Sequence, residues 1–300
     1  MEKHFDVAVS LTSKALNVTQ HSPPAKMTAP ATWRDTNRHI QILRKAEEGK
    51  YGVIAAIASN IEHIYGLVAA AEQARSPLII QFFPWAVTFA DGLLVRAAKD
   101  AVSRATVPIS IHLDHAKSED VIKRAADSLP FDSIMVDMSH YDKEENLEKT
   151  AWLVKYCQER GIATEAEPGR IEGAEDEVDE FIATGVDALA PAFGNVHGEY
   201  GRQGPQLDFE RFEKIRTQIN GRFSVALHGT NGFPPDLMSK CVAAGAVKIN
   251  VNKLVLDDYY THLRSQVANV PHTALIEEGT GHVIRQTKEW MEICGSAGRA

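Results

Sequence analysis

The stretch ISIHLDHAKSED, residues 109–120, decides the fold because it joins a buried strand to a group of reactive side chains. Branched apolar residues alternate along its first half, which is the pattern of a strand with a buried face. His112, Asp114 and His115 then stand where that strand should end, and polar residues follow. The stretch therefore predicts a strand whose C-terminal end carries two imidazoles and a carboxylate.

Other short apolar runs repeat this strand pattern along the chain. Together with 107–113, they cover residues 51–58, 77–83, 131–137, 161–167, 186–192, 223–228 and 246–251. Amphipathic helical patterns separate them, one of which starts after the capping candidate Asn60. Strands alternating with helices in this way predict an α/β protein with a (β/α)8 TIM barrel. A doubly wound open sheet competes, but the first run lacks the glycine-rich turn that such a sheet usually carries.

The N-terminal segment has a different composition from the rest of the chain. Within residues 1–36, the stretch TQHSPPAKMTAPATWRD is rich in proline, alanine and threonine, which is typical of a linker or arm. We therefore expect an N-terminal extension over residues 1–36 and a single barrel domain over residues 37–300.

Charge and cysteine content narrow the classes of partner and compartment. The net charge of −8 repels nucleic-acid phosphates and anionic lipid surfaces, so neither a nucleic-acid nor a membrane partner is expected. The three cysteines are odd in number and far apart, which suits a reducing compartment. With no apolar run of about 18 residues to span a bilayer, the sequence predicts a cytoplasmic protein that binds a small molecule.

A barrel of this kind carries its chemistry at the C-terminal ends of its strands. His115, His197 and His228 follow three different predicted strands, and Glu167 follows a fourth. Each histidine alone is better explained as a packed core or loop residue. Together with an acid, and with room left for water or substrate, they favour a catalytic Zn²⁺.

Glycine-flanked loops after the sixth and seventh predicted strands indicate an anion site. Glycines there permit close backbone approach, so that amide N–H groups can converge on an anion. Ordinary tight turns are the simpler reading of each loop alone. Because Lys248, Asn250 and Lys253 follow these loops in the sequence, we expect a phosphate site to which Lys248 also contributes. Its candidate residues are Gly198, Gly229, Asn231, Asn250 and Lys253.

Seven motifs in order along the chain resemble one family. They are IHLDHA, SIMVDMSHYDKEENL, TEAEPGRIEGAED, FGNVHGEYG, ALHGTNG, GAVKINV and the terminal EICGSAGRA. They are similar to the class II, metal-dependent ketose-bisphosphate aldolases, and the resemblance runs from about residue 37 to residue 300.

The resemblance implies roles for individual residues. Asp114 matches the acid/base that handles the proton of the aldehyde oxygen, and Glu175 matches a loop carboxylate that exchanges a proton on dihydroxyacetone phosphate. The implied zinc ligands are His115, His197 and His228, with Glu167 in some states. The implied phosphate-binding residues are Gly198, Gly229, Asn231 and Asn250. A monovalent cation, Na⁺ or K⁺, and a homodimer or a higher homo-oligomer are also implied.

The expected reaction is the reversible cleavage of fructose 1,6-bisphosphate to dihydroxyacetone phosphate and glyceraldehyde 3-phosphate. Zn²⁺ would polarise the C2 carbonyl and stabilise the enediolate, because a proton next to a carbonyl is too weakly acidic for an unaided carboxylate. Phe83, Asn252 and Lys253 depart from the family pattern, which keeps tagatose bisphosphate or another phosphorylated ketose as an alternative substrate. A catalytically silent metal-binding sensor or scaffold is an alternative of another class, although it would not need Asp114.

Overall fold

Eight parallel strands close into a barrel in the computed structural model, which describes residues 32–168 and 174–300. Neighbours along the chain pair with one another, and β1 also pairs with β8, so no open edge remains. The strands are β1 (Val53–Ile57), β2 (Leu78–Phe82), β3 (Ile109–Ala116), β4 (Ser133–Val136), β5 (Ala163–Ala166), β6 (Ala188–Leu189), β7 (Ser224–Leu227) and β8 (Lys248–Val251). The predicted TIM barrel is confirmed, and the open doubly wound sheet is excluded.

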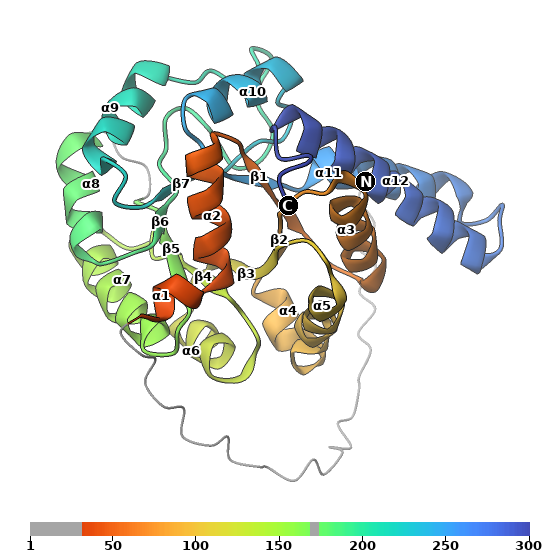
Figure 1. The fold of residues 1–300 in the computed structure, drawn as a ribbon, viewed down its shortest axis with the longest axis horizontal. Coiled ribbons are helices and arrows are strands. Elements are labelled where there is room, and N and C mark those ends of the chain that lie inside the picture. Colours follow the sequence, from red (N-terminus) through yellow and green to blue (C-terminus); the bar gives the residue numbers. More distant parts are fainter. Residues whose placement is uncertain (1–31, 169–173) are drawn as a thin grey trace, which may run out of the picture.

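Helices surround the barrel, and all described helices except α1 and α2 follow one of its strands (Figure 1). They are α1 (Trp33–Thr36), α2 (Arg38–Gly49), α3 (Ile61–Ala74), α4 (Trp85–Thr88), the 3-10 helix η1 (Phe89–Gly92), α5 (Leu93–Arg104), α6 (Glu119–Ser128), α7 (Lys143–Gln158), α8 (Ala174–Ala183), α9 (Phe209–Ile219), α10 (Pro235–Ala243), α11 (Lys253–Gln266) and α12 (His272–Ile293). Asn60 caps α3 as expected, since its side chain accepts a hydrogen bond from the backbone N–H of His63. In the described part of the chain, no helix combines the length and apolar character that a bilayer crossing requires.

Helix α2 covers the N-terminal end of the barrel. Ile42, Leu43 and Ala46 on this helix are buried in one cluster with residues near the N-terminal ends of the strands, such as Val53 and Val247. This packing removes the apolar face of α2 from water, which is the main source of its stability. It leaves the opposite, C-terminal end of the strands for the functional site.

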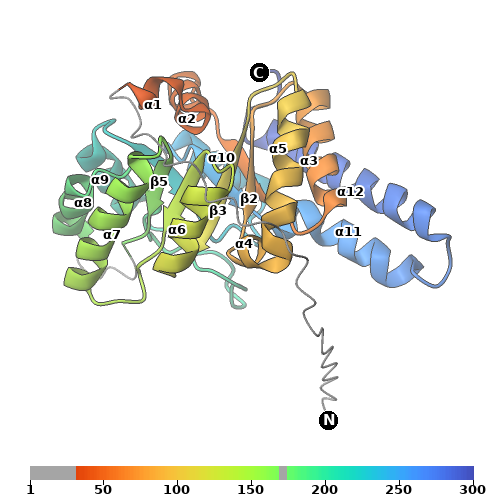
Figure 2. The ribbon, with the colours of Figure 1, turned by 90° about the horizontal axis from the view of Figure 1, so that it is seen from below.

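Helices α11 and α12 form a pair that extends away from the barrel (Figure 2). α12 also packs closely on α3, because a Cβ atom placed on Gly66 would lie 2.9 Å from the side chain of Val283. A similar close approach joins the pair itself, where a Cβ on Gly279 would lie 3.1 Å from the ring of Tyr259. The small residues thus set the spacing of these helices.

Strand β3 continues beyond the end of its apolar sequence pattern. The apolar alternation ends at Leu113, but β3 continues through His115 to Ala116. The pairing register of β3 with β4 shifts between Leu113 and Ala116, which marks a bulge. His115 has a φ of 49° there, a left-handed conformation that is uncommon for a residue other than glycine. The bulge redirects the His115 side chain at the rim of the barrel.

The interior of the barrel is unusually polar. Barrel interiors are normally filled by branched apolar side chains, yet His112, Glu165 and Lys248 here have no exposed surface. Ser110 and Ser133 are also buried, with exposed fractions of 0% and 1%. Because buried polar groups need partners, this column of side chains must be organised by internal hydrogen bonds and ion pairs.

Candidate active site

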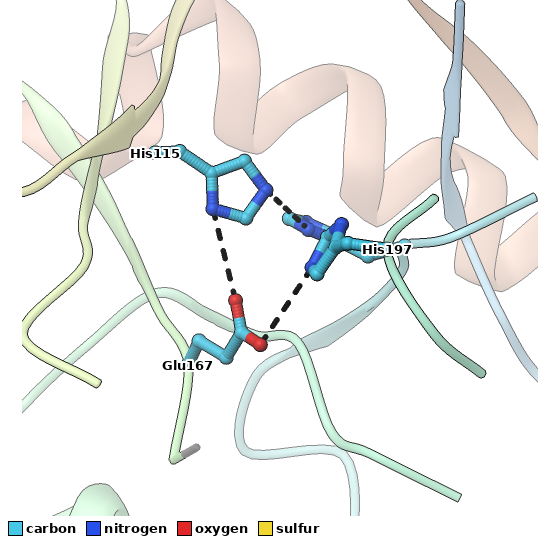
Figure 3. A group of neighbouring side chains, drawn as sticks. His115, Glu167 and His197 are labelled. Carbon is cyan, nitrogen blue, oxygen red and sulfur yellow. Dashed lines mark hydrogen bonds and ion pairs between the residues drawn. The ribbon is translucent and has the colours of Figure 1, made fainter. Parts of the chain in front are cut away.

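Four side chains from four strand ends meet at the C-terminal rim of the barrel. His115 lies in β3, Glu167 follows β5, His197 follows β6 and His228 follows β7. One possible ligand atom from each lies within 4.8 Å of the others. Figure 3 shows His115, Glu167 and His197 pointing toward one another. The structure therefore brings together the complete set of ligands expected from the sequence.

The orientation of His115 is fixed by Asp137. Its Nδ1 lies 2.8 Å from Oδ2 of Asp137, while Oδ1 of Asp137 accepts a 2.6 Å hydrogen bond from the hydroxyl of Ser139. Burial opposes a charge on His115, but the hydrogen bond to Asp137 and the charges of Asp114 and Glu167 outweigh it and raise the pKa of His115 to about 9. A bound cation would displace that proton, as metal binding to histidine generally does.

The orientation of His228 is fixed in the same way by Glu165. The Nε2 atom of His228 lies 2.7 Å from Oε1 of Glu165, and its Nδ1 lies 3.2 Å from Nε2 of His115. If each ring gives its proton to its carboxylate, the two facing nitrogens both present lone pairs and cannot hydrogen-bond to each other. A cation between them resolves this conflict, and a carboxylate behind a metal-binding histidine is the usual arrangement.

The remaining two side chains complete a set that fits a catalytic ion. Glu167 lies 3.8 Å from Nδ1 of His115 and 3.7 Å from Nε2 of His197. The side chain of His197 is 52% exposed, so one side of the cluster faces solvent. Neutral imidazoles with one carboxylate and an open position suit Zn²⁺ in a catalytic site. The residues present therefore fit the expected metal.

A second group, of two acids and one histidine, lies deeper in the barrel. His112, Asp114 and Glu165 place possible ligand atoms within the same 4.8 Å limit, and all three are buried. Lys248 neutralises this group, since its Nζ lies 3.0 Å from Oε2 of Glu165. Burial opposes ionisation of Glu165, but the Lys248 charge and the hydrogen bond from His228 hold the pKa of Glu165 well below its usual value.

Lys248 also determines how Asn250 faces Asp114. Lys248 donates a 2.7 Å hydrogen bond to Oδ1 of Asn250, so that Nδ2 of Asn250 lies 3.2 Å from Oδ1 of Asp114. Lys248 itself is completely buried. The expectation that it contributes directly to a phosphate site is therefore wrong, because its ammonium group is already surrounded by protein acceptors.

His112 packs rather than reaching the cavity. Its Nδ1 lies 3.0 Å from the hydroxyl of Ser133, and its ring stacks on His39 with centroids 5.3 Å apart. Burial, followed by the charge of Lys248, lowers the pKa of His112 well below its usual value. His112 is thus a neutral, packed histidine that supports the site from within the barrel.

One cavity of about 120 Å³ connects the metal cluster with the expected phosphate-binding loops. Asp114, His115 and His197 line one part of it. The expected phosphate residues that line it are Gly198, Gly229, Asn231 and Asn250. Gly229 has a φ of 67°, and a Cβ there would lie 2.3 Å from the carbonyl oxygen of Val196. Only glycine permits this close approach of the two loops.

For two expected site residues, Lys253 and Glu175, the structure shows no contact with the cavity among the described side chains. Lys253 does not line this cavity and instead pairs with Glu199. Glu175 falls in the first turn of α8, and its side chain lies outside the described residues. The roles assigned to both therefore stay predictions.

Comparison with known proteins places this site in a family. The sequence profile of the class II fructose-bisphosphate aldolases matches residues 37–299. The chain belongs to the class II fructose-bisphosphate aldolase family. The protein is therefore an aldolase, and the resemblance drawn from the motifs is confirmed.

Other aldolases of this family cover most of the chain. A protein of Coccidioides immitis (strain RS), named as a provisional fructose-bisphosphate aldolase, is 44% identical over 288 residues, which are 88% of this chain and 95% of that one. The fructose-bisphosphate aldolase of Geobacillus stearothermophilus is 37% identical over 230 residues, 71% of this chain and 79% of that one.

Solved structures agree with the aldolase fold. A crystal structure of the Coccidioides immitis protein superposes with a TM-score of 0.85 at 45% identity and covers 88% of this chain and 98% of that one. The YdjI aldolase of Escherichia coli K12 superposes with a TM-score of 0.80 at 29% identity, with the same coverage of both chains.

Sequence reasoning missed the groups that support the aldolase site. Asp137 and Glu165 lie in the predicted strand runs 131–137 and 161–167, but the sequence does not predict their hydrogen bonds to His115 and His228. A signal existed for Glu165, since a charged residue inside an apolar strand pattern needs a buried partner. The sequence does not reveal that this partner is Lys248, which lies 83 residues away.

Proposed function

We propose that this aldolase reversibly cleaves fructose 1,6-bisphosphate to dihydroxyacetone phosphate and glyceraldehyde 3-phosphate, with Zn²⁺ as its metal. The observation that carries the proposal is the pair of facing nitrogens, Nε2 of His115 and Nδ1 of His228, beside Asp114 in one cavity. Bound by these residues, a divalent ion would draw electron density from the substrate carbonyl and stabilise the negative charge that develops as the carbon–carbon bond breaks.

Asp114 is suited to move the proton of the sugar hydroxyl. Its side chain lines the cavity, and only 3% of the residue is exposed. The amide Nδ2 of Asn250 lies 3.2 Å and 3.4 Å from its two carboxylate oxygens, and Nε2 of Gln81 lies 3.5 Å from Oδ2. These amides fix the direction of the carboxylate without taking up its proton, as a general acid/base requires. In cleavage, Asp114 accepts the hydroxyl proton that the departing aldehyde leaves behind.

The loops around the same cavity would hold the phosphate of the ketose half. Gly198, Gly229 and Asn231 come from the loops after β6 and β7, where backbone N–H groups are free of side-chain bulk. Glu175 would exchange the proton on the ketose carbon, as the family resemblance implies. Both roles are part of the proposal.

A tagatose bisphosphate, or another phosphorylated ketose, is the second candidate substrate. Phe83 supports it, because this aromatic ring lines the cavity at a position where the family resemblance implies a small hydroxyl residue. A change in wall shape near the reacting carbons alters which sugar epimer fits. The chemistry and the roles of Asp114 and the metal ligands stay the same.

The test is elemental analysis of the purified protein combined with a cleavage assay on both epimers. We expect bound zinc, loss of cleavage with EDTA, recovery on adding Zn²⁺, and preference for the fructose epimer. Equal or better turnover of tagatose bisphosphate would reverse the substrate assignment. A zinc-loaded protein that cleaves neither substrate would favour the silent sensor or scaffold instead.

Further expectations accompany this proposal. A monovalent cation near the phosphate loops, a homodimer, and a cytoplasmic location follow from the sequence and the family resemblance, and each stays a prediction. The same holds for the division between an N-terminal extension and a barrel at residue 37.

A further inference from the structure

One ion pair joins two sides of the cavity mouth. Lys253, the first residue of α11, donates a hydrogen bond through Nζ to Oε1 of Glu199. Glu199 belongs to the loop after β6 that also carries His197. Both side chains reach solvent, with exposed fractions of 49% for Lys253 and 75% for Glu199. The hydrogen bond to Glu199, and then its charge, raise the pKa of Lys253 above its usual value.

The neighbours of this pair face the expected phosphate position. Gly198, next to Glu199, and Asn252, next to Lys253, both line the cavity. Among the described residues that line it, there is no lysine or arginine. Lys253 is thus a cation one residue away from the cavity wall, and a phosphate dianion held by the loops would come within reach of its flexible side chain.

The Glu199 carboxylate resembles a phosphate oxygen in its contact with Lys253. Both are anionic oxygens that accept a charge-assisted hydrogen bond from the ammonium group. We propose that Glu199 sets the affinity of the site for phosphate, because it holds Lys253 in the free enzyme and is displaced when a substrate phosphate binds. The inference rests on the proposed function only for the identity of the phosphate carrier.

Two effects of Glu199 act in the same direction. Its carboxylate competes with phosphate for Lys253, and its negative charge repels an incoming phosphate. The competition requires Lys253, whereas the repulsion does not. An ordinary surface ion pair would have neither consequence for binding at the cavity, so the two cases can be separated by measuring phosphate affinity in paired variants.

The experiment is a titration of the metal-loaded full chain with inorganic phosphate, and separately with dihydroxyacetone phosphate, by calorimetry at low ionic strength. Glu199→Gln should tighten binding by about threefold to fivefold, the range expected from one exposed ion pair. Lys253→Met should weaken it by about tenfold, as expected for loss of a charged hydrogen bond. In the Lys253→Met background, Glu199→Gln should have less than about half of its effect on the binding free energy.

Controls keep the result specific to this pair. Glu210→Gln removes an exposed carboxylate from α9, away from the cavity lining, and should leave phosphate binding unchanged. The tightening in Glu199→Gln should also shrink as salt is added, because exposed charges are screened. Metal content should stay the same, since a loss would show that Glu199 acts through His197.

The outcomes separate this inference from the proposed function. Unchanged or weaker phosphate binding in Glu199→Gln, an equal effect with and without Lys253, or a loss of metal would overturn the inference. Failure to cleave either ketose bisphosphate would contradict the proposed function, while leaving the phosphate titrations interpretable. Phosphate binding that follows the expected pattern in an inactive protein would therefore support only the role of Glu199.

Discussion

Two groups that combine histidine and acidic side chains lie in this barrel, one at the rim and one deeper, and they differ in exposure and in charge partners. The rim group contains His115, His197, His228 and Glu167, and it is partly open to solvent. The deeper group contains His112, Asp114 and Glu165, which are all buried. Both groups bring histidine and carboxylate ligand atoms within 4.8 Å of one another, so proximity alone would suggest two metal sites.

The two groups differ in whether the protein itself supplies a cation. Lys248 places an ammonium group 3.0 Å from Glu165, so that the deeper carboxylate is neutralised by the protein itself. At the rim, Asp137 and Glu165 each bind one ring nitrogen of a histidine, which turns the other ring nitrogens of His115 and His228 toward each other at 3.2 Å. The comparison teaches that a cluster suits a metal ion when its hydrogen-bond partners turn several ligand atoms toward one point. A cluster that already contains a buried lysine has its negative charge neutralised and serves to support the metal ligands instead.

The largest expected effect tests whether the deeper group serves chemistry and not metal binding. Asp114→Ala should lower the cleavage rate by about 10²–10⁴-fold, because it removes general acid/base transfer. The zinc content should stay the same, since Asp114 belongs to the deeper group. Steady-state kinetics and elemental analysis of the same preparation measure both. Loss of zinc together with activity, or full retained activity, would contradict the division into two groups.

The next largest effect tests whether Lys248 stabilises the buried carboxylate of Glu165. Lys248→Met leaves the fully buried Glu165 carboxylate without its partner, which should lower the free energy of unfolding by about 3–5 kcal/mol. Denaturant titration of the full chain measures this loss.

A rescue and a matched control sharpen that test. Adding Glu165→Gln to Lys248→Met should recover much of the stability, because no buried charge is then unpaired. Lys253→Met removes an exposed lysine that lies beyond the C-terminal end of β8, and it should change the stability by less than about 0.5 kcal/mol. Similar losses in the two single lysine variants would mean that burial of Lys248 has no special energetic role.

The smallest effect concerns His39, which stacks beneath the deeper group on His112. Burial, and then the charge of Lys248, lower the pKa of His39 to about 3, although Glu165 opposes the shift. The unfolded chain therefore takes up a proton first, near pH 6.5. The stability from neutral His39 is fully present above that pH and is lost as the pH falls toward 3.

His39→Phe removes this proton-linked loss while keeping an aromatic ring against His112. Between pH 7 and pH 5, the variant should lose about 2 kcal/mol less unfolding free energy than the parent protein. Urea denaturation at both pH values measures the difference. The other groups that face His39, namely Ser110, His112, Lys248 and Glu165, are the same in both proteins. An equal loss in the two proteins would show that His39 already carries its proton in the folded state.

Much of the fold was predictable because parallel barrel strands are buried on both faces. Such strands appear as short apolar runs, and each run in the sequence contains or overlaps one observed strand. The rim residues were predictable for a related reason, since the C-terminal ends of all strands meet at one end of a barrel. His115, Glu167, His197 and His228 therefore had to converge once the barrel closed.

The supporting contacts were not predictable in this way. The left-handed backbone of His115 arises from the bulge between β3 and β4, which depends on pairing and not on local propensity. The pairing of Lys253 with Glu199 depends on where two loops end. The prediction that Lys248 binds phosphate was wrong, because its position after a glycine-containing turn does not reveal that its side chain is completely buried.

The sequence by itself determined the barrel, the rim of reactive residues and the family, because periodicity and motif order are local or collinear properties of the chain. Only the tertiary structure decided which ring nitrogens face the metal position, which carboxylates orient them, and which lysine neutralises the interior. These choices depend on distances between residues far apart in the chain, such as Glu165 and Lys248, and such distances exist only after the barrel has closed.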